Sequence, residues 1–230
     1  MKLAVIPARG GSQRIPRKNI KAFGGQPMIA WSIHAALQCG CFDQVIVSTD
    51  DDEIAQVALQ CGASVPFMRP TTLADNHTGT TPVVAHAIDW VNQHIAPVSQ
   101  ACCIYATAPF ITPDDLQRGL DTLVSTGCDY AFSITHYAFP IQRALRINRN
   151  ERVEMLQPEH LDTRSQDLEE AWHDAGQFYW GKASAWLATL PIFNSDSAPV
   201  PLPRHRVQDI DTPEDWQRAE LMFAAWHAGA

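Results

Sequence analysis

The sequence has no long apolar run and no excess of positive charge. No stretch approaches the roughly 20 apolar residues of a membrane-spanning helix. The apolar run over residues 3–8 stops at Arg9, too early for a secretion signal. Lysine and arginine number 17 against 25 acidic residues, so the net charge is −8. This balance argues against a general nucleic-acid or anionic membrane surface. We expect a cytoplasmic protein that binds neither nucleic acid nor membrane.

Paired cysteines and the common nucleotide motifs are also absent. The six cysteines include no CxxC pair, and no histidine stands at zinc-finger spacing from them. We interpret them as buried, reduced thiols. Neither GxxxxGK[ST] nor GxGxxG occurs. Any phosphate-binding site in this chain must therefore be of another type.

Short apolar runs alternate with helical patterns along most of the 230 residues. The patterns predict strands over residues 2–8, 44–50, 64–68, 101–106 and 130–135. They predict helices over residues 27–40, 51–62, 80–94 and 113–126. This alternation is typical of a three-layer α/β fold with a mostly parallel, Rossmann-like sheet. The length suits a single domain covering residues 1–230.

The alternation fails over residues 136–177. Residues 144–150 and 151–156 read as a hairpin, and the segment ends with the aromatic residues Trp172, Phe178 and Tyr179. We interpret the segment as an insertion that covers a site or pairs with another subunit. An exposed aromatic patch of this kind predicts a homodimer.

The α/β pattern returns at residue 174 and closes with a predicted strand over residues 206–210 and a helix that starts at residues 211–216. Thr212 as N-cap, Pro213 in the first helical position and Asp215 three residues after the cap form a capping-box signature. Just before it, "QDID" places Asp209 and Asp211 two positions apart. In a strand both side chains would point to the same side, which suits a shared Mg²⁺ ion. The alternative is that the two residues form an ordinary strand end.

A second acidic stretch, "TDDDE" at residues 49–53, is interpreted as a helix start rather than as a second metal site.

The loop "RGGSQRIPRKN", residues 9–19, concentrates positive charge directly after the first predicted strand. Ligands of open parallel sheets bind at this carboxyl end. Gly10 and Gly11 permit backbone N–H groups to approach an anion. The charge comes from Arg9, Arg14, Arg17 and Lys18. We predict a phosphate cradle, with a solvated surface loop as the alternative.

The longer stretch "IPARGGSQRIPRKNI" resembles the signature loop of the CMP-sialic acid synthetase (acylneuraminate cytidylyltransferase) family. "VSTDDDEIAQVA", "GASVPFMRPTTLADNHTGT" and "VQDIDTPEDW" match in order, so the resemblance covers nearly the whole chain. "IYATAPF", "THYAFPIQRAL" and "TRSQDLEEAWHDAGQFYWG" are most similar to the family's pseudaminic acid cytidylyltransferases. The resemblance implies a nucleotidyltransferase fold and Mg²⁺ as cofactor. It implies transfer of CMP from CTP to the anomeric hydroxyl of a nonulosonic acid, with release of pyrophosphate. The stretches most similar to pseudaminic acid cytidylyltransferases imply that this acid is pseudaminic acid.

The resemblance also implies roles for individual residues. Arg9, Lys18 and Asp211 would be catalytic, and Asp209 and Asp211 would bind the metal. The substrate-binding residues implied are Ala8, Gly10, Gly11, Ser12, Asn19, Arg69, Thr78, Thr80, Ala106, His136, Arg143 and Arg164. From the residues alone, Arg69 could equally form a surface salt bridge and Thr80 a helix N-cap. His136, Arg143 and Arg164 could be plain surface charges, and Arg164 could reach a partner's site.

One departure from the family concerns the acceptor. Sialic acid synthetases carry a glutamine near the sugar where this chain has Ala106 and Thr107. This difference favours pseudaminic acid as acceptor, with a CMP synthetase for N-acetylneuraminic or legionaminic acid as the alternative. Two other classes of protein could bind a nucleotide with this fold: a glycosyltransferase of related fold and a nucleotide sensor without catalysis. The basic first loop and the acidic pair near the C-terminus favour the cytidylyltransferase.

Overall fold

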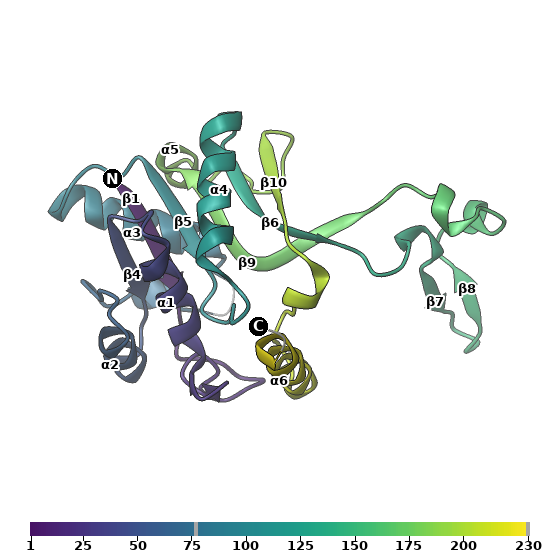
Figure 1. Ribbon diagram of the computed structural model, residues 1–230, viewed down its shortest axis with the longest axis horizontal. Helices are drawn as coiled ribbons and strands as arrows, with labels where there is room; N and C mark the ends of the chain where they lie inside the picture. Colours follow the sequence, from purple (N-terminus) through teal and green to yellow (C-terminus); the bar gives the residue numbers. More distant parts are fainter. Residues whose placement is uncertain (76–77, 229–230) are drawn as a thin grey trace.

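The computed structural model describes residues 1–75 and 78–228 and is built on a six-stranded sheet (Figure 1). The strand order is β10-β6-β9-β5-β1-β4. Their bounds are β1 (Lys2–Pro7), β4 (Gln44–Ser48), β5 (Gln100–Ile104), β6 (Tyr130–His136), β9 (Trp172–Lys182) and β10 (Ser197–Pro201). β1 is parallel to β4 and β5, and β10 is parallel to β6. Only β9 runs antiparallel to its neighbours. The mostly parallel sheet is thus confirmed.

Helices cover both faces of this sheet. They are α1 (Met28–Cys39), α2 (Asp52–Gln60), α3 (Thr80–His94), α4 (Pro113–Thr126), α5 (Ala183–Leu187) and α6 (Pro213–Ala228). Apolar residues of α1, α2 and α4 share one buried cluster with the sheet, and those of α3 and α5 share another. The three-layer expectation is confirmed. Single 3-10 turns occur at Thr71–Leu73, Ile141–Arg143, Pro158–His160, Ser165–Asp167 and Arg204–Arg206.

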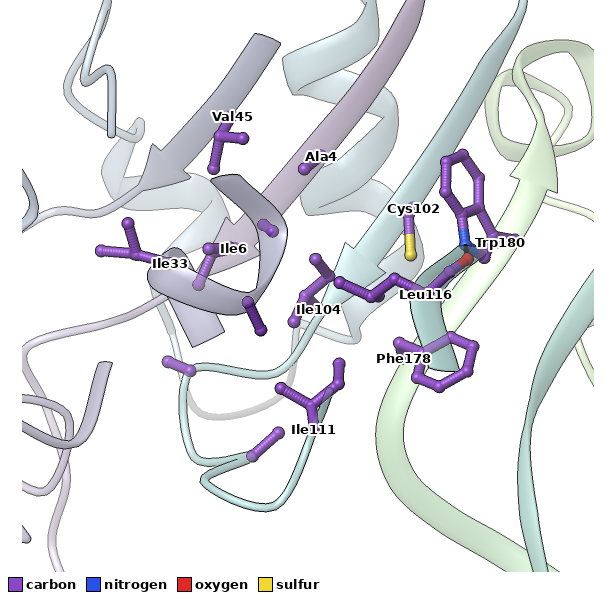
Figure 2. Packing of buried hydrophobic residues seen from close by; sticks show 14 of the residues in the cluster. Ala4, Ile6, Ile33, Val45, Cys102, Ile104, Ile111, Leu116, Phe178 and Trp180 are labelled. Atoms are coloured by element: carbon purple, nitrogen blue, oxygen red, sulfur yellow. Dashed lines mark hydrogen bonds between the residues drawn. The ribbon is translucent and has the colours of Figure 1, made fainter. Parts of the chain in front are cut away.

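Helix α4 shows how local sequence and packing agree. Thr112 and Asp115 form a capping box, and the helix ends at Gly127 in the left-handed conformation. Gly119 faces the sheet, where an added Cβ would lie 2.6 Å from Trp180 and 2.7 Å from Phe178. The glycine therefore allows the close approach in which the Trp180 indole donates to the Leu116 carbonyl at 2.9 Å (Figure 2).

Two strands predicted from the sequence are wrong. Residues 64–68 form only isolated bridges, at Ser64 and Met68, and residues 206–210 form no strand. The strand in that part of the chain is β10, which contains Pro199 and Pro201. Prolines weaken a strand pattern in a sequence, but β10 lies at the sheet edge, where proline is tolerated.

Residues 137–171, here called the arm, connect β6 to β9 and project away from the body (Figure 1). The arm leaves and rejoins the sheet at paired positions, His136 and Trp172. It contains the predicted hairpin, as β7 (Leu145–Ile147) and β8 (Val153–Met155). The expected aromatic patch is wrong for Phe178 and Tyr179, which lie on β9 and are buried in the core, whereas Trp172 is exposed.

The C-terminal helix closes the fold against the first loop. Phe23 in the short strand β2 (Ala22–Phe23), which pairs with β3 (Gln26–Pro27), packs edge-on against Trp216 and Phe223 of α6. Thr212 and Asp215 form the predicted capping box, with hydrogen bonds of 2.8 and 3.2 Å. This docking sets residues 209–211 beside the basic loop. None of the helices described is long and apolar enough to cross a membrane.

Candidate active site

A cavity of about 290 Å³ opens where β1 and β5 end. The basic loop forms one wall, and residues around the start of α3 form another. The segment after β5 and Asp211 complete the lining. The cavity brings together nine of the site residues that the resemblance implies: Arg9, Ser12, Lys18, Asn19, Arg69, Thr78, Thr80, Ala106 and Asp211.

Positive charge dominates the cavity wall. Lys18 donates from Nζ to the Ile210 carbonyl at 2.6 Å and lies 3.4 Å from the Asp211 carboxylate. Arg14 lies 2.9 Å from the other oxygen of Asp211. Arg9 donates to the Asp75 carbonyl at 2.9 Å. Because Arg69 also lines the cavity, its lining includes four cationic side chains and one carboxylate, a balance that favours an anionic ligand.

Arg69 is buried, so the surface salt-bridge alternative is wrong. Its guanidinium donates to the Ser48 side chain at 3.1 Å and to the Ser48 carbonyl. Burial lowers the pKa of Arg69, and the charge of Asp50 opposes this effect. Its side chain forms no ion pair with another described residue. A buried guanidinium at a cavity wall is therefore available to a ligand's acceptor atoms.

The glycines of the loop do not line the cavity. The Gly10 N–H donates to the Asp50 carboxylate at 3.0 Å, and a Cβ at Gly10 would lie 2.6 Å from the Asp51 side chain. Gly10 thus serves the packing of the loop against the residues that follow β4. Ala8 uses its N–H to bond the Ser48 carbonyl. Gly11 has open space around it.

Arg17 points away from the cavity, contrary to the expectation that all four loop cations serve the cradle. It binds Asp51 through two bonds of 2.5 and 3.0 Å and also pairs with Glu53. The bond to Arg17 lowers the pKa of Asp51. Asp51 also caps α2 by accepting from the Ile54 N–H at 3.0 Å. The helix-start interpretation of residues 49–53 is therefore confirmed.

The acidic pair lies on irregular backbone, so the strand geometry predicted for it is wrong. Asp211 lines the cavity, whereas Asp209 lines a neighbouring hollow of about 730 Å³. Partial burial raises the pKa of Asp209, and the charge of Asp211 raises it further. The two carboxylates are therefore close enough to repel each other although their side chains line different hollows.

The sugar-side residues separate in the structure. His136 lines the larger hollow with Asp174, Arg204, Asp209 and Arg218. Arg143 instead donates to the Thr163 carbonyl within the arm. Arg164, also on the arm, pairs with Asp167 at 2.7 Å. Neither arginine reaches the cavity of its own chain.

Tyr105 is a cavity residue that the sequence reasoning missed. Its hydroxyl lies 3.4 Å from Thr80 Oγ1, and burial raises its pKa. Thr80 is the first residue of α3, and Gly79 occupies the N-cap, so the N-cap alternative for Thr80 is wrong. The predicted strand over residues 101–106 included Tyr105, whereas β5 ends at Ile104, so the tyrosine follows the strand and reaches the cavity.

Comparison with known proteins agrees with this geometry. The family model described as "Cytidylyltransferase" matches residues 3–218. A pseudaminic acid cytidylyltransferase of Campylobacter jejuni is 43% identical over 99% of this chain and 98% of its own. A CMP-N,N'-diacetyllegionaminic acid synthase of Legionella pneumophila is 32% identical over 96% and 95%. The structure of CMP:2-keto-3-deoxy-manno-octonic acid synthetase complexed with CTP shares the fold. Its TM-score is 0.69 at 18% identity, over 97% of this chain and 98% of that one. The chain therefore belongs to the cytidylyltransferase family.

Proposed function

We propose that the chain transfers CMP from CTP to the anomeric hydroxyl of pseudaminic acid and releases pyrophosphate. The observation that carries the proposal is the convergence of Arg9, Arg14, Lys18 and Arg69 on one cavity at the carboxyl end of the sheet. The similarity to a pseudaminic acid cytidylyltransferase over nearly the full chain supports the choice of acceptor. The basic cavity suits an intact triphosphate better than the nucleotide-sugar of a glycosyltransferase.

The cavity residues divide between the two parts of CTP. We assign the triphosphate to Arg9, Ser12 and Lys18, which lie on the basic loop. Arg69, Thr78 and Thr80 form the opposite wall and are assigned to the base and ribose. Asn19 is buried and donates to the Arg9 carbonyl at 3.0 Å. It therefore supports the loop in addition to any contact with the nucleotide.

The reaction requires positioning and charge neutralisation. The anomeric hydroxyl gives up its proton to solvent as its oxygen forms a bond to the α-phosphorus, and the bond from that phosphorus to the pyrophosphate oxygen breaks. Negative charge then grows on the leaving pyrophosphate, where Arg9 and Lys18 stabilise it. The contact of Lys18 with the Ile210 carbonyl fixes the direction of its ammonium group before substrate arrives.

Asp209 and Asp211 are the residues that would hold a Mg²⁺ ion, because their carboxylates lie close enough to interact although they line neighbouring hollows. Mg²⁺ commonly takes one or two carboxylates and completes its shell with phosphate oxygens and water. Among residues 1–75 and 78–228, no group of three acidic, histidine or cysteine side chains could hold a metal ion. A Mg²⁺ ion in this protein would therefore need ligands from the substrate phosphates in addition to the two carboxylates. Burial raises the pKa of Asp209 and the charge of Asp211 raises it further, and a bound cation would offset both effects. When bound, the ion would neutralise phosphate charge and orient the α-phosphate.

The acceptor assignment rests on Ala106. Ala106 is buried and lines the cavity, and its methyl group offers no hydrogen bond to a sugar hydroxyl. His136 in the larger hollow is assigned to the acceptor side. We expect N-acetylneuraminic acid to be turned over at least ~100-fold less efficiently than pseudaminic acid, which corresponds to about 3 kcal/mol in the transition state.

The arm supports a homodimer. Several of its apolar side chains are exposed and have no cover in the single chain: Phe139, Leu145, Ile147, Val153, Leu156 and Leu161. A two-stranded hairpin is marginally stable alone, so a second copy is the natural cover. Arg164 lies on this arm and does not line the cavity of its own chain. We therefore propose that Arg164 contacts substrate in the active site of the partner subunit. Six free cysteines, half of them buried, are compatible with the cytoplasmic location that we propose.

A product assay tests the proposed function. The purified protein is incubated with CTP, Mg²⁺ and one of pseudaminic, legionaminic or N-acetylneuraminic acid, and both pyrophosphate and the CMP-sugar are measured. We expect pseudaminic acid to give both products in equal amounts. Efficient use of another acid would overturn the acceptor assignment, and no pyrophosphate with any acid would overturn the function.

The same assay tests the metal site with Asp211→Asn, which keeps the shape of the side chain. Activity of this variant should require a higher Mg²⁺ concentration than the parent. If the two Mg²⁺ titrations superimpose, Asp211 is structural.

A further inference from the structure

We infer that Asp174 binds the hydrogen-bond donors of the acceptor sugar, its hydroxyl or acylamino N–H groups, and that Tyr179 holds Asp174 in position. The inference rests on the proposed function, because it concerns the acceptor of that reaction. Neither residue belongs to the basic loop or to the acidic pair near the C-terminus.

An irregularity in the pairing of β9 sets the direction of the Asp174 side chain. The pairing of β6 with β9 shifts register between Phe132 and Ile134, and Gly176 has a φ of 63°. Such a bulge redirects the side chains beside it. The Gly176 N–H donates to Asp174 Oδ1 at 2.9 Å, so the turn that displaces Asp174 also holds it.

Tyr179 fixes the second oxygen of this carboxylate. The phenol is buried, and its hydroxyl donates to Asp174 Oδ2 at 2.5 Å. Burial raises the pKa of Tyr179, so the hydroxyl remains a donor at neutral pH. A bond from a neutral phenol to a carboxylate is charge-assisted and gives the carboxylate a definite direction.

The same tyrosine contacts the nucleotide side. The rings of Tyr179 and Tyr105 are 5.2 Å apart, and the Tyr105 hydroxyl faces Thr80 at 3.4 Å. Both Tyr105 and Thr80 line the cavity assigned to CTP. A continuous series of polar groups thus runs from the nucleotide cavity through the core to Asp174.

Asp174 retains capacity for a ligand on its open side. It lines the 730 Å³ hollow and also a second one of about 280 Å³ that includes Trp172 and Phe193. A carboxylate has about four lone-pair positions, and the two bonds to Gly176 and Tyr179 occupy only two. Asp174 forms no ion pair with another residue that the structure describes. Its remaining positions are therefore suited to neutral donors.

Charge decides which end of the acceptor faces Asp174. The carboxylate of a nonulosonic acid would be repelled by Asp174 and by Asp209. Arg204 and Arg218 line the same hollow and offer the opposite charge. The acceptor's carboxylate end is therefore directed to the arginine side, and its hydroxyl and acylamino groups are left for Asp174.

The test uses Asp174→Asn and Tyr179→Phe with matched controls. Asp129→Asn changes a half-buried carboxylate that pairs with Lys182, and Tyr130→Phe removes a buried hydroxyl that donates to the Leu190 carbonyl. Steady-state kinetics give KM for pseudaminic acid and for CTP separately, and thermal unfolding shows that each variant is folded.

We expect Asp174→Asn to raise KM for pseudaminic acid at least tenfold and Tyr179→Phe to raise it three- to tenfold. KM for CTP should stay within twofold of the parent, and both controls should match the parent. An unchanged KM for the acid in folded Asp174→Asn would overturn the inference, as would an equal rise of both KM values. Failure of the parent protein to use pseudaminic acid would instead count against the proposed function.

Discussion

Neighbouring cations of the basic loop have different tasks, and the difference lies in where each side chain points. Arg9 and Lys18 line the cavity, whereas Arg17, one residue before Lys18, binds Asp51 and Glu53 beside α2. Arg17 has a φ of 55°, which turns its side chain to the other side of the loop. Charge in the loop therefore serves both the ligand and the fold.

Replacement of Arg9 by alanine should affect catalysis without affecting folding. Removal of one preorganised cation from the path of the leaving pyrophosphate should lower kcat/KM for CTP by about two to three orders of magnitude. The melting temperature should stay near that of the parent. Near-parental turnover of Arg9→Ala would contradict the assignment of this residue.

Arg17→Ala is the matched control from the same loop. Because its ion pairs are partly exposed, we expect a loss of about 1 kcal/mol in the free energy of unfolding. The kinetic constants for CTP should change little. Loss of CTP turnover as large as that of Arg9→Ala would show that the two side chains share one role.

At the scale of elements, the approach of α4 to the sheet depends on Gly119. Alanine normally favours a helix over glycine by about 1 kcal/mol. Here the new methyl group would overlap Trp180 and Phe178, so Gly119→Ala should destabilise the protein by about 1–3 kcal/mol. Urea unfolding measures the change, with Ser125→Ala on the exposed side of α4 as control. A more stable Gly119→Ala variant would show that α4 can move away from the sheet at little cost.

The connection of α4 to the segment before Asp209 is a buried ion pair. Arg206 binds Asp115 through two bonds of 2.6 and 3.1 Å. Burial by itself would raise the pKa of Asp115, but the bonds from Arg206 and Thr112 outweigh it and hold the pKa below its ordinary value of 3.8. Apart from the 3-10 turn Arg204–Arg206, the segment between β10 and α6 has no helix or strand, so this pair is one of its main anchors.

A lowered pKa in the folded state means that the ionised Asp115 stabilises the fold above pH 3.8, and that this contribution disappears as the pH falls below that value. Asp115→Asn should therefore cost about 3 kcal/mol at neutral pH, because it leaves Arg206 unpaired. The difference from the parent should shrink below pH 4. Unfolding curves from pH 7 to pH 3 check this, with exposed Asp121→Asn as control. A difference that does not vary with pH would contradict the electrostatic explanation.

At the scale of the whole molecule, the arm leaves most of its apolar side chains exposed in the single chain, so we expect a second copy to cover them. We expect a dimer by light scattering at micromolar concentration. Leu145→Glu combined with Ile147→Glu places charge on the exposed apolar hairpin and should shift the protein to a monomer. Val124→Glu changes an equally exposed apolar residue on α4 and should leave the dimer intact. A monomeric parent protein would contradict the proposed assembly.

Local sequence by itself determined much of this protein. The bounds of α3 and α4 followed from the helical pattern, and the basic loop followed from its glycines and charges, because these signals act within a few residues. The resemblance to the family likewise depended on contiguous stretches. Sequence reasoning also placed the hairpin in the arm, since turn residues between two short apolar runs are a local signal.

Other features of the fold and the site were decided only by the tertiary structure. These features depend on the packing of separate elements and on contacts between residues far apart in the chain. The edge position of β10 explains its prolines, and the pairing of β9 with β6, with its register shift, sets the positions of Asp174 and Tyr179. Burial of Arg69 against Ser48 turned an apparent surface charge into a cavity residue. Docking of α6 brought Asp211 to Lys18 across 193 positions of sequence. No local pattern encodes such pairings; they arise from the packing of whole elements around a shared core.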